Sequence, residues 1–175
     1  MIIGQKIYLR EVNDSDIETI LMIENDSENW TLSGNENSYS RKDIENYISG
    51  IKDLYTDRQF RWMICLNEND ECIGSIDLFE YSFALNSAGV GITIDKKERK
   101  KGYAIEALKM LLSHSFNQLN LARLWASILD HNLQSQKLFE KASFIKIDEK
   151  KNHLLIDGEW HNEYIYELVN PNIKK

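Results

Sequence analysis

The 175-residue chain is long enough for one hydrophobic core and short for two ordinary domains, so one domain is expected. A net charge of −7 argues against a general nucleic-acid binder, because affinity for phosphate backbones comes mainly from clustered Lys and Arg. No apolar run approaches the roughly 20 residues of a membrane span, and the start lacks the pattern of a secretory signal. We therefore expect a cytoplasmic protein that contacts neither nucleic acid nor membrane.

A strand and two amphipathic helices come first along the chain. Residues Lys6 to Val12 alternate in polarity as a half-buried strand does. Ser15 and Glu18 have the spacing of a capping box and predict the start of a helix. Ser40 is expected to cap a second helix, since apolar residues then recur at i, i+3, i+4 and i+7: Ile44, Tyr47, Ile48 and Ile51.

An antiparallel hairpin follows the two helices. Two apolar and aromatic runs, Phe60 to Leu66 and Ile73 to Phe79, are joined by a polar turn. The two cysteines of the chain, Cys65 and Cys72, belong to neither a disulfide framework nor a zinc set by their spacing. We expect both to be inert strand residues.

The second half alternates strands and helices before two closing strands. We expect strands at Ala88 to Asp95 and Leu121 to Leu129, helices at Gly102 to Phe116 and Leu133 to Ala142, and final strands at Lys146 to Leu155 and Glu159 to Val169. Asp157-Gly158 is a tight-turn signal between the last two. The elements together predict a mixed α/β (α+β) domain around one sheet.

A dense basic loop separates the strand that ends near Asp95 from the helix that opens at Gly102. Five of the six residues from 96 to 101 are basic in a chain of net charge −7. Backbone N–H groups and the positive end of the helix dipole point into this loop, and a glycine lets a phosphate approach closely. The loop lacks the further glycines of GxxxxGK[ST] and GxGxxG. A solvated basic turn is the alternative interpretation.

Two blocks resemble the GNAT superfamily of acetyltransferases. Residues Arg99 to Ala104 fit its [Q/R]-x-x-G-x-[G/A] pyrophosphate loop. About thirty residues on, the segment N-x-x-[S/A]-x-x-[L/I]-[Y/F/L]-E-K-x-G-F is matched at Asn132, Ser135, Leu138, Phe139, Glu140, Lys141 and Phe144. The opening YLREVNDSD and the closing DGEWHNEYIYEL are similar to the subfamily of diamine (spermidine) acetyltransferases and ribosomal-protein N-terminal acetyltransferases.

This resemblance implies a GNAT-like domain over residues 1–170 with a short tail at 171–175. The implied architecture is a mixed, mostly antiparallel central sheet of six to seven strands flanked by about four helices. The implied reaction moves an acetyl group from acetyl-CoA directly onto a primary amine, either a small polyamine-like amine or a peptide N-terminus. No metal is implied, and a homo-oligomer is compatible with the pattern.

The resemblance also assigns the acetyl-CoA contacts. The residues expected to bind the pyrophosphate are Arg99, Lys100, Lys101, Gly102, Tyr103 and Ala104. The backbone of Ile92, Thr93 and Ile94 is expected to pair with the pantetheine arm as an added strand does. Asn132 and Ser135 match the second cofactor-contacting segment. For each lysine separately, an exposed solubilising role is the alternative.

Amine acetylation needs a group that removes a proton, because an ammonium ion is no nucleophile. Diamine-acetylating relatives carry acidic residues in the hairpin strand and at the start of the central strand. Here Asp77 and Glu80 lie in the hairpin strand, and the central-strand position is Gly89. Glu80 is our candidate for the base or amine anchor, with a solvated carboxylate as the alternative.

The departing thiolate has no obvious proton donor, since the tyrosine of many family members is replaced here by Phe139. We assign this role to Ser135. Tyr103, Tyr164 and Tyr166 are alternatives, and an unassisted departure is another because a thiol is already fairly acidic. Ser143 replaces the usual glycine of the second block.

Tryptophans and histidines are expected to be structural. Core positions are expected for Trp30, Trp62, Trp125 and Trp160, although Trp30 could also line the acceptor site. His131 and His161 are expected to be structural or surface residues, because the four histidines show no metal spacing. Two competing functions remain: a CoA-binding regulatory module that has lost catalysis, suggested by Phe139 and Gly89, and a basic-loop domain that binds anionic partners.

Overall fold

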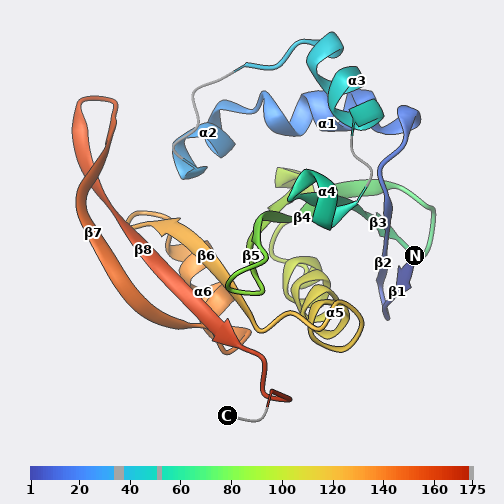
Figure 1. The fold of residues 1–175 in the computed structure, drawn as a ribbon. Coiled ribbons are helices and arrows are strands. Elements are labelled where there is room, and N and C mark those ends of the chain that lie inside the picture. The colour runs from blue at the N-terminus through green and yellow to red at the C-terminus, as the bar shows by residue number, and fades with distance from the viewer. Residues whose placement is uncertain (34–37, 51–52, 174–175) are drawn as a thin grey trace.

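The computed structural model describes residues 1–33, 38–50 and 53–173, which build one eight-stranded sheet (Figure 1). The strand order is β1-β2-β3-β4-β5-β6-β8-β7. The strands are β1 Ile2–Ile3, β2 Ile7–Glu11, β3 Phe60–Leu66, β4 Cys72–Ser82, β5 Ser87–Ile94, β6 Arg123–Leu129, β7 Ile145–Ile156 and β8 Glu159–Val169. Only β5 and β6 pair in parallel. The predicted mixed, mostly antiparallel sheet is confirmed, and the short β1 takes the strand count above the predicted six to seven.

Six α-helices lie in the described residues, against about four predicted. They are α1 Ile17–Glu24, α2 Ser27–Ser33, α3 Arg41–Gly50, α4 Leu54–Asp57, α5 Tyr103–Asn117 and α6 Leu133–Lys141. The short α2 and α4 account for the difference. Ile51, predicted on the buried face of the second helix, lies outside the described residues. Within the part of the chain that the structure describes, no helix combines the length and the apolarity that crossing a membrane requires.

Helices cover both faces of the sheet. Successive side chains of β3 point to opposite faces, so alternate residues of this strand pack against different helices. Met63 and Cys65 pack with Ile17, Ile20 and Ile44 of α1 and α3 in one cluster. The intervening strand residues belong to the larger core with α5 and α6, which includes Trp62, Ile64, Leu66, Leu108, Leu111 and Phe139. Figure 1 shows α1 to α3 on one side of the sheet, with α5 on the other. The site therefore rests on a sheet supported from both sides.

The predicted capping box of Ser15 and Glu18 is wrong. Asn13 and Asp16 form the box instead, with Ser15 N–H donating to Asn13 Oδ1 at 2.9 Å and Asn13 N–H donating to Asp16 Oδ2 at 2.8 Å. Asp16 is fixed in this place by Arg10, which donates to both carboxylate oxygens at 2.7 Å. This ion pair between residues six positions apart favours the earlier start.

The cap of the second helix is confirmed. Asp43 N–H donates to Ser40 Oγ at 3.2 Å, and Ser40 N–H donates to Asp43 Oδ2 at 2.7 Å. Each side chain satisfies a backbone donor that the first helical turn leaves unpaired.

The prediction that both cysteines are unlinked strand residues is also wrong, because Cys65 and Cys72 form a disulfide. A register shift between Ile64 and Cys65 places the two cysteines opposite each other on β3 and β4. The sequence shows two cysteines seven residues apart, and only the pairing of the strands brings their side chains together.

A long hairpin of β7 and β8 closes the chain (Figure 1). Its turn is the predicted one, and Asp157 and Gly158 both adopt positive φ angles, 49° and 84°. Such angles match the twist of a two-residue hairpin turn. Trp160 beside this turn is 59% exposed, so its predicted core position is wrong.

Candidate active site

The central strands β5 and β6 separate along their length. Their parallel ladder consists of three pairs and ends at Gly89 and Trp125. Beyond this pair β5 continues to Ile94 and β6 to Leu129, while each remains paired with its outer neighbour. The inner edge of β5 that carries Ile92, Thr93 and Ile94 therefore faces a gap in the sheet. An unpaired strand edge is a template for an extended ligand backbone.

The basic loop begins where this strand edge ends. Gly102 precedes α5 with a φ of +92°, and no side chain caps the helix there. A Cβ atom built at Gly102 would meet no other atom within 4 Å, so the space over the helix start is open. Tyr103 and Ala104 form the first turn of α5, whose N–H groups point toward this space. The geometry suits an anion such as a phosphate.

Most cations of the loop have partners in the structure. Arg99 donates to Ile94 O at 2.9 Å, to Glu28 Oε1 at 2.9 Å and to Asn29 Oδ1 at 2.8 Å. Lys96 pairs with Glu28 at 2.5 Å, and this hydrogen bond with the nearby Arg99 holds the pKa of Glu28 below its usual range. The guanidinium of Arg99 therefore anchors α2 to the loop in this arrangement.

The two predicted lysine contacts differ in their surroundings. Lys101 pairs with Glu98 at 2.9 Å, which raises the lysine pKa. Lys100 is exposed and has a φ of 65°. Both lie within two residues of Gly102 in the sequence.

Helix α2 bridges the two arms of the gap (Figure 1). On the β5 side it is held by the contacts of Glu28 and Asn29 with the basic loop. On the β6 side, Asn132 Nδ2 donates to Leu32 O at 3.3 Å, and a ring nitrogen of His131 contacts Thr31 O at 2.9 Å. The mouth of the gap is thereby framed by α2, the loop and the start of α6.

The second predicted contact segment begins α6. Asn132 is 9% exposed and caps the helix by accepting from Ser135 N–H at 3.1 Å. Ser135 is half-buried in the first turn, so the structure brings both residues to the end of β6 that borders the gap. Phe139 lies one turn further on, 3% exposed and edge-on to Phe144. An apolar side chain suits that buried position.

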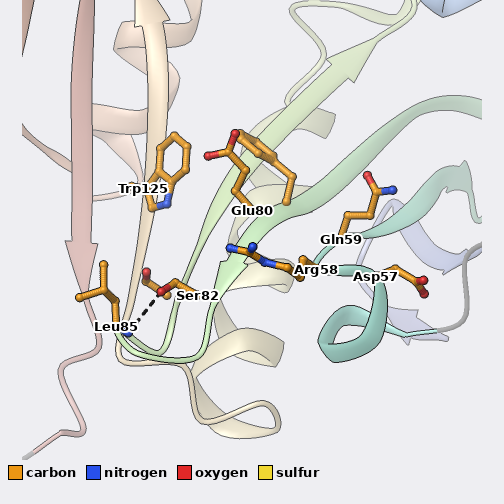
Figure 2. Close-up of a pocket in the computed structure, with 9 residues that line it drawn as sticks. Asp57, Arg58, Gln59, Glu80, Ser82, Leu85 and Trp125 are labelled. Carbon is orange, nitrogen blue, oxygen red and sulfur yellow. Dashed lines mark hydrogen bonds between the residues drawn. The ribbon is translucent and has the colours of Figure 1, made fainter.

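Glu80 lines an open pocket of about 890 Å³ beside the point where β5 and β6 separate (Figure 2). It is exposed and has a φ of 49°, at a register shift of β4 between Phe79 and Ser82. Such a bulge turns a side chain away from its regular direction. Figure 2 shows the Glu80 side chain beside Trp125, with the Arg58 guanidinium extending toward Ser82 below Glu80 and Asp57 further away.

Gly89 leaves room for two aromatic rings. Phe79 and Trp125 pack edge to face with centroids 5.2 Å apart. A Cβ atom at Gly89 would lie 2.6 Å from the Phe79 ring and 2.9 Å from Trp125. An acidic side chain therefore has no space at this position, because the aromatic pair fills it.

Asp77, the second carboxylate of the hairpin strand, is not available to an amine. Arg61 donates to both of its oxygens, at 2.6 and 3.1 Å, and to Glu24 Oε1 at 2.6 Å. Burial alone would lower the pKa of Arg61, but the two carboxylates outweigh it and raise that pKa. Glu80 thus stays the carboxylate of this strand that faces the pocket.

The three tyrosines considered as alternative proton donors to the thiolate lie in other parts of the fold than Ser135. Tyr166 is buried and donates to Glu140 at 3.1 Å; burial and this hydrogen bond raise its pKa to about 12. Lys146 lies 3.3 Å from the centroid of the Tyr164 ring, in the β7–β8 hairpin. Tyr103 is half-buried at the start of α5. Ser135 remains our candidate, because it alone belongs to the segment at the end of β6.

The sequence did not predict the contact between the side chains of His131 and His161. His131 Nδ1 lies 3.2 Å from His161 Nδ1, and His161 Nδ1 lies 3.0 Å from Asp130 Oδ1. The residues are thirty positions apart, and no local pattern signals their contact. Trp30, considered for the acceptor site, donates its indole N–H to Glu24 O at 2.5 Å.

Comparison with known proteins agrees with this geometry. Residues 6–145 match the family model described as the acetyltransferase (GNAT) domain. The chain therefore belongs to this family, and it is an N-acetyltransferase.

Individual relatives match either nearly the whole chain or about half of it. The probable N-acetyltransferase YjcK of Bacillus subtilis is 27% identical over 98% of each chain. The ribosomal protein uS5-alanine N-acetyltransferase of Escherichia coli is 30% identical over 47% of this chain and 43% of its own. Among solved structures, the spermidine N-acetyltransferase of Vibrio cholerae in complex with CoA and spermine superposes with a TM-score of 0.87 at 20% identity, covering 95% and 97% of the two chains. This likeness shows the same fold.

Proposed function

We propose that the protein binds acetyl-CoA in the gap between β5 and β6 and transfers the acetyl group directly to a primary amine. The observation that carries the proposal is the end of the β5–β6 ladder at Gly89 and Trp125. Beyond it, an unpaired strand edge leads from the Glu80 pocket to the open helix start at Gly102. A long ligand fits here if its peptide-like arm lies along the strand edge and its phosphate group lies at the helix start.

Each part of the gap has a separate binding task in this proposal. The backbone of Ile92, Thr93 and Ile94 offers hydrogen bonds to the pantetheine amides. The first turn of α5 offers N–H groups to the pyrophosphate, with Lys100 and Lys101 adding positive charge. Acetyl-CoA supplies the activated acetyl group as a thioester, and the residues of the chain hold it and manage the protons.

We propose a polyamine-like amine or a peptide N-terminus as acceptor. The related proteins named above act on a ribosomal-protein alanine and on spermidine. In this chain, Glu80 brings a carboxylate to the pocket, which Arg58 also lines. The Glu80 carboxylate attracts an ammonium group, anchors it and relieves it of its proton through water.

Ser135 is our proposed proton donor to the leaving thiolate. Its backbone is fixed by the Asn132 cap, which sets the direction of the first turn of α6. Neither the regulatory module nor the anion-binding domain gains support from the structure, whereas family membership favours an enzyme.

A screen of amines with acetyl-CoA tests the proposed activity. Release of free CoA thiol should depend on the amine added, and we expect it with spermidine, spermine or a peptide with a free N-terminal alanine. Mass spectrometry should show one acetyl group gained by that amine. Background hydrolysis with every amine, together with unaltered amines, would contradict the transferase proposal.

Glu80→Gln is expected to lower kcat/KM for the accepted amine by roughly tenfold to over a hundredfold. The reason is the loss of a charge-assisted contact, which typically contributes about 1.5 to 3 kcal/mol. The affinity for acetyl-CoA should stay nearly unchanged, since Glu80 lies in the pocket and not at the helix start. Steady-state kinetics with varied amine measures the first effect, and calorimetric titration measures the second.

Glu159→Gln is the matched control. Glu159 is exposed at the start of β8, next to the β7–β8 turn, so this variant changes the net charge equally without touching the pocket or the basic loop. Equal activity of both variants on every accepted amine would place the amine anchor elsewhere.

A further inference from the structure

Three metal-binding side chains converge where β6 ends. Asp130 and His131 directly follow β6. His161 lies near the start of β8, two residues before Glu163, where the pairing of β8 with β6 begins. The three donor atoms are Asp130 Oδ1, His131 Nδ1 and His161 Nδ1. They lie 3.0, 3.2 and 3.5 Å apart in pairs.

These separations suit a tetrahedral metal ion. A Zn²⁺ ion with ligands at about 2.0 to 2.1 Å separates its donors by about 3.3 Å along each tetrahedral edge. The observed triangle has edges of 3.0 to 3.5 Å, so one ion can contact all three atoms with little movement. Two imidazoles and a carboxylate also form a recurrent protein ligand set for Zn²⁺.

The ring of His131 is already oriented for such a role. Its Nε2 lies 2.9 Å from Thr31 O, a carbonyl that can only accept a hydrogen bond. The proton is therefore on Nε2, and the lone pair of Nδ1 points into the triangle. Metal-bound histidines are commonly held in this way by a backbone carbonyl.

The carboxylate is also held from outside the triangle. Asn162 N–H donates to Asp130 Oδ2 at 2.9 Å, which leaves Oδ1 directed at the histidines. The side chains of Asp130, His131 and His161 are 25%, 28% and 20% exposed. An ion can therefore enter from solvent, and a water molecule can fill a fourth position.

We propose that Asp130, His131 and His161 form a binding site for one divalent transition metal ion of the Zn²⁺ class. The ion replaces the hydrogen-bonding proton between the two Nδ1 atoms and joins β6 to β8. Through the Thr31 carbonyl it also strengthens the attachment of α2, which frames the mouth of the gap. The site is separate from the Glu80 pocket and does not depend on the proposed acetyl transfer.

Cobalt titration of the full chain without an affinity tag tests the proposal. Co²⁺ occupies zinc sites and gives visible absorption that reports coordination. We expect a saturable spectrum with one Co²⁺ per chain, displaced by Zn²⁺. His161→Ala should weaken binding by more than ~100-fold, since even outer partners of metal ligands contribute about 10- to 100-fold in affinity.

His153→Ala is the matched control. His153 lies 3.4 Å from the Glu163 carboxylate and its side chain is 43% exposed, so it is a histidine beside an acid without a second imidazole. Its loss should leave the spectrum unchanged. Equal binding by wild type and the His161→Ala variant, or no saturable binding by wild type, would overturn the proposal.

Folding of the variants is checked by circular dichroism and thermal melting in chelator. If His161→Ala does not fold, X-ray absorption of zinc-loaded wild type decides instead. We expect an N/O shell at about 2.0 to 2.1 Å that contains imidazole. A shell of sulfur, or of oxygen without imidazole, would rule the site out. All measurements omit acetyl-CoA, so failure here leaves the transferase proposal standing.

Discussion

Replacing Gly102 with glutamate is expected to abolish the stabilisation of the protein by acetyl-CoA. In wild type, ligand at 100 times its Kd should contribute about 2.7 kcal/mol, or roughly 5 to 10 °C in Tm. Gly102 has a φ of +92°, which a side chain disfavours, and the new carboxylate would occupy the open space where a phosphate is proposed to bind. Affinity should fall by about 100-fold or more, because two or more charge-assisted contacts are lost.

Gly158→Glu is the matched control for this variant. Gly158 also has a positive φ, 84°, and its Cβ position is equally open, but it lies in the β7–β8 turn. Both substitutions should lower the ligand-free Tm by a similar amount, and only Gly102→Glu should lose the response to acetyl-CoA. S-acetyl-pantetheine, which lacks the pyrophosphate, should stabilise wild type far less. An undiminished shift in Gly102→Glu would contradict the proposed phosphate site.

Arg61→Met is expected to destabilise the fold by about 3 to 5 kcal/mol, or roughly 6 to 20 °C in Tm. Arg61 is the common partner of Asp77 and Glu24, and its side chain is only 15% exposed. Its guanidinium also lies 5.2 Å from the centroid of the Tyr47 ring. Removing the cation leaves two half-buried carboxylates without this partner, and α1 and α3 lose their contacts with Arg61 through Glu24 and Tyr47. Urea unfolding measures the change.

Arg123→Met serves as the control, since its pair with Glu167 is at 3.2 Å and its side chain is 44% exposed. An exposed pair contributes less than about 1 kcal/mol, so this variant should unfold close to wild type. Adding Asp77→Asn and Glu24→Gln to Arg61→Met should recover part of the lost stability, because no uncompensated charge then remains. No recovery would mean that packing, and not charge, makes Arg61 important.

Local patterns predicted the elements well. Hydrophobic periodicity indicated the strands and the longer helices, and the turn residues Asp157 and Gly158 marked the final hairpin. The motifs near Gly102 and Asn132 indicated the N-acetyltransferase family, and the family model that matches residues 6–145 confirms it. The short α2 and α4 escaped prediction, because a helix of one or two turns carries too little periodicity and depends on tertiary contacts.

Contacts across the sheet were decided by the tertiary structure alone. Strand register made a disulfide of Cys65 and Cys72, brought Arg61 against Asp77, and carried His161 to His131. The sequence by itself determined the family, most of the strands and the basic loop, because these depend on local spacing. Two features depend on pairing between strands that are far apart in the sequence: which carboxylate of β4 faces the pocket, and which side chains come together at the end of β6. A single sequence does not record such pairing.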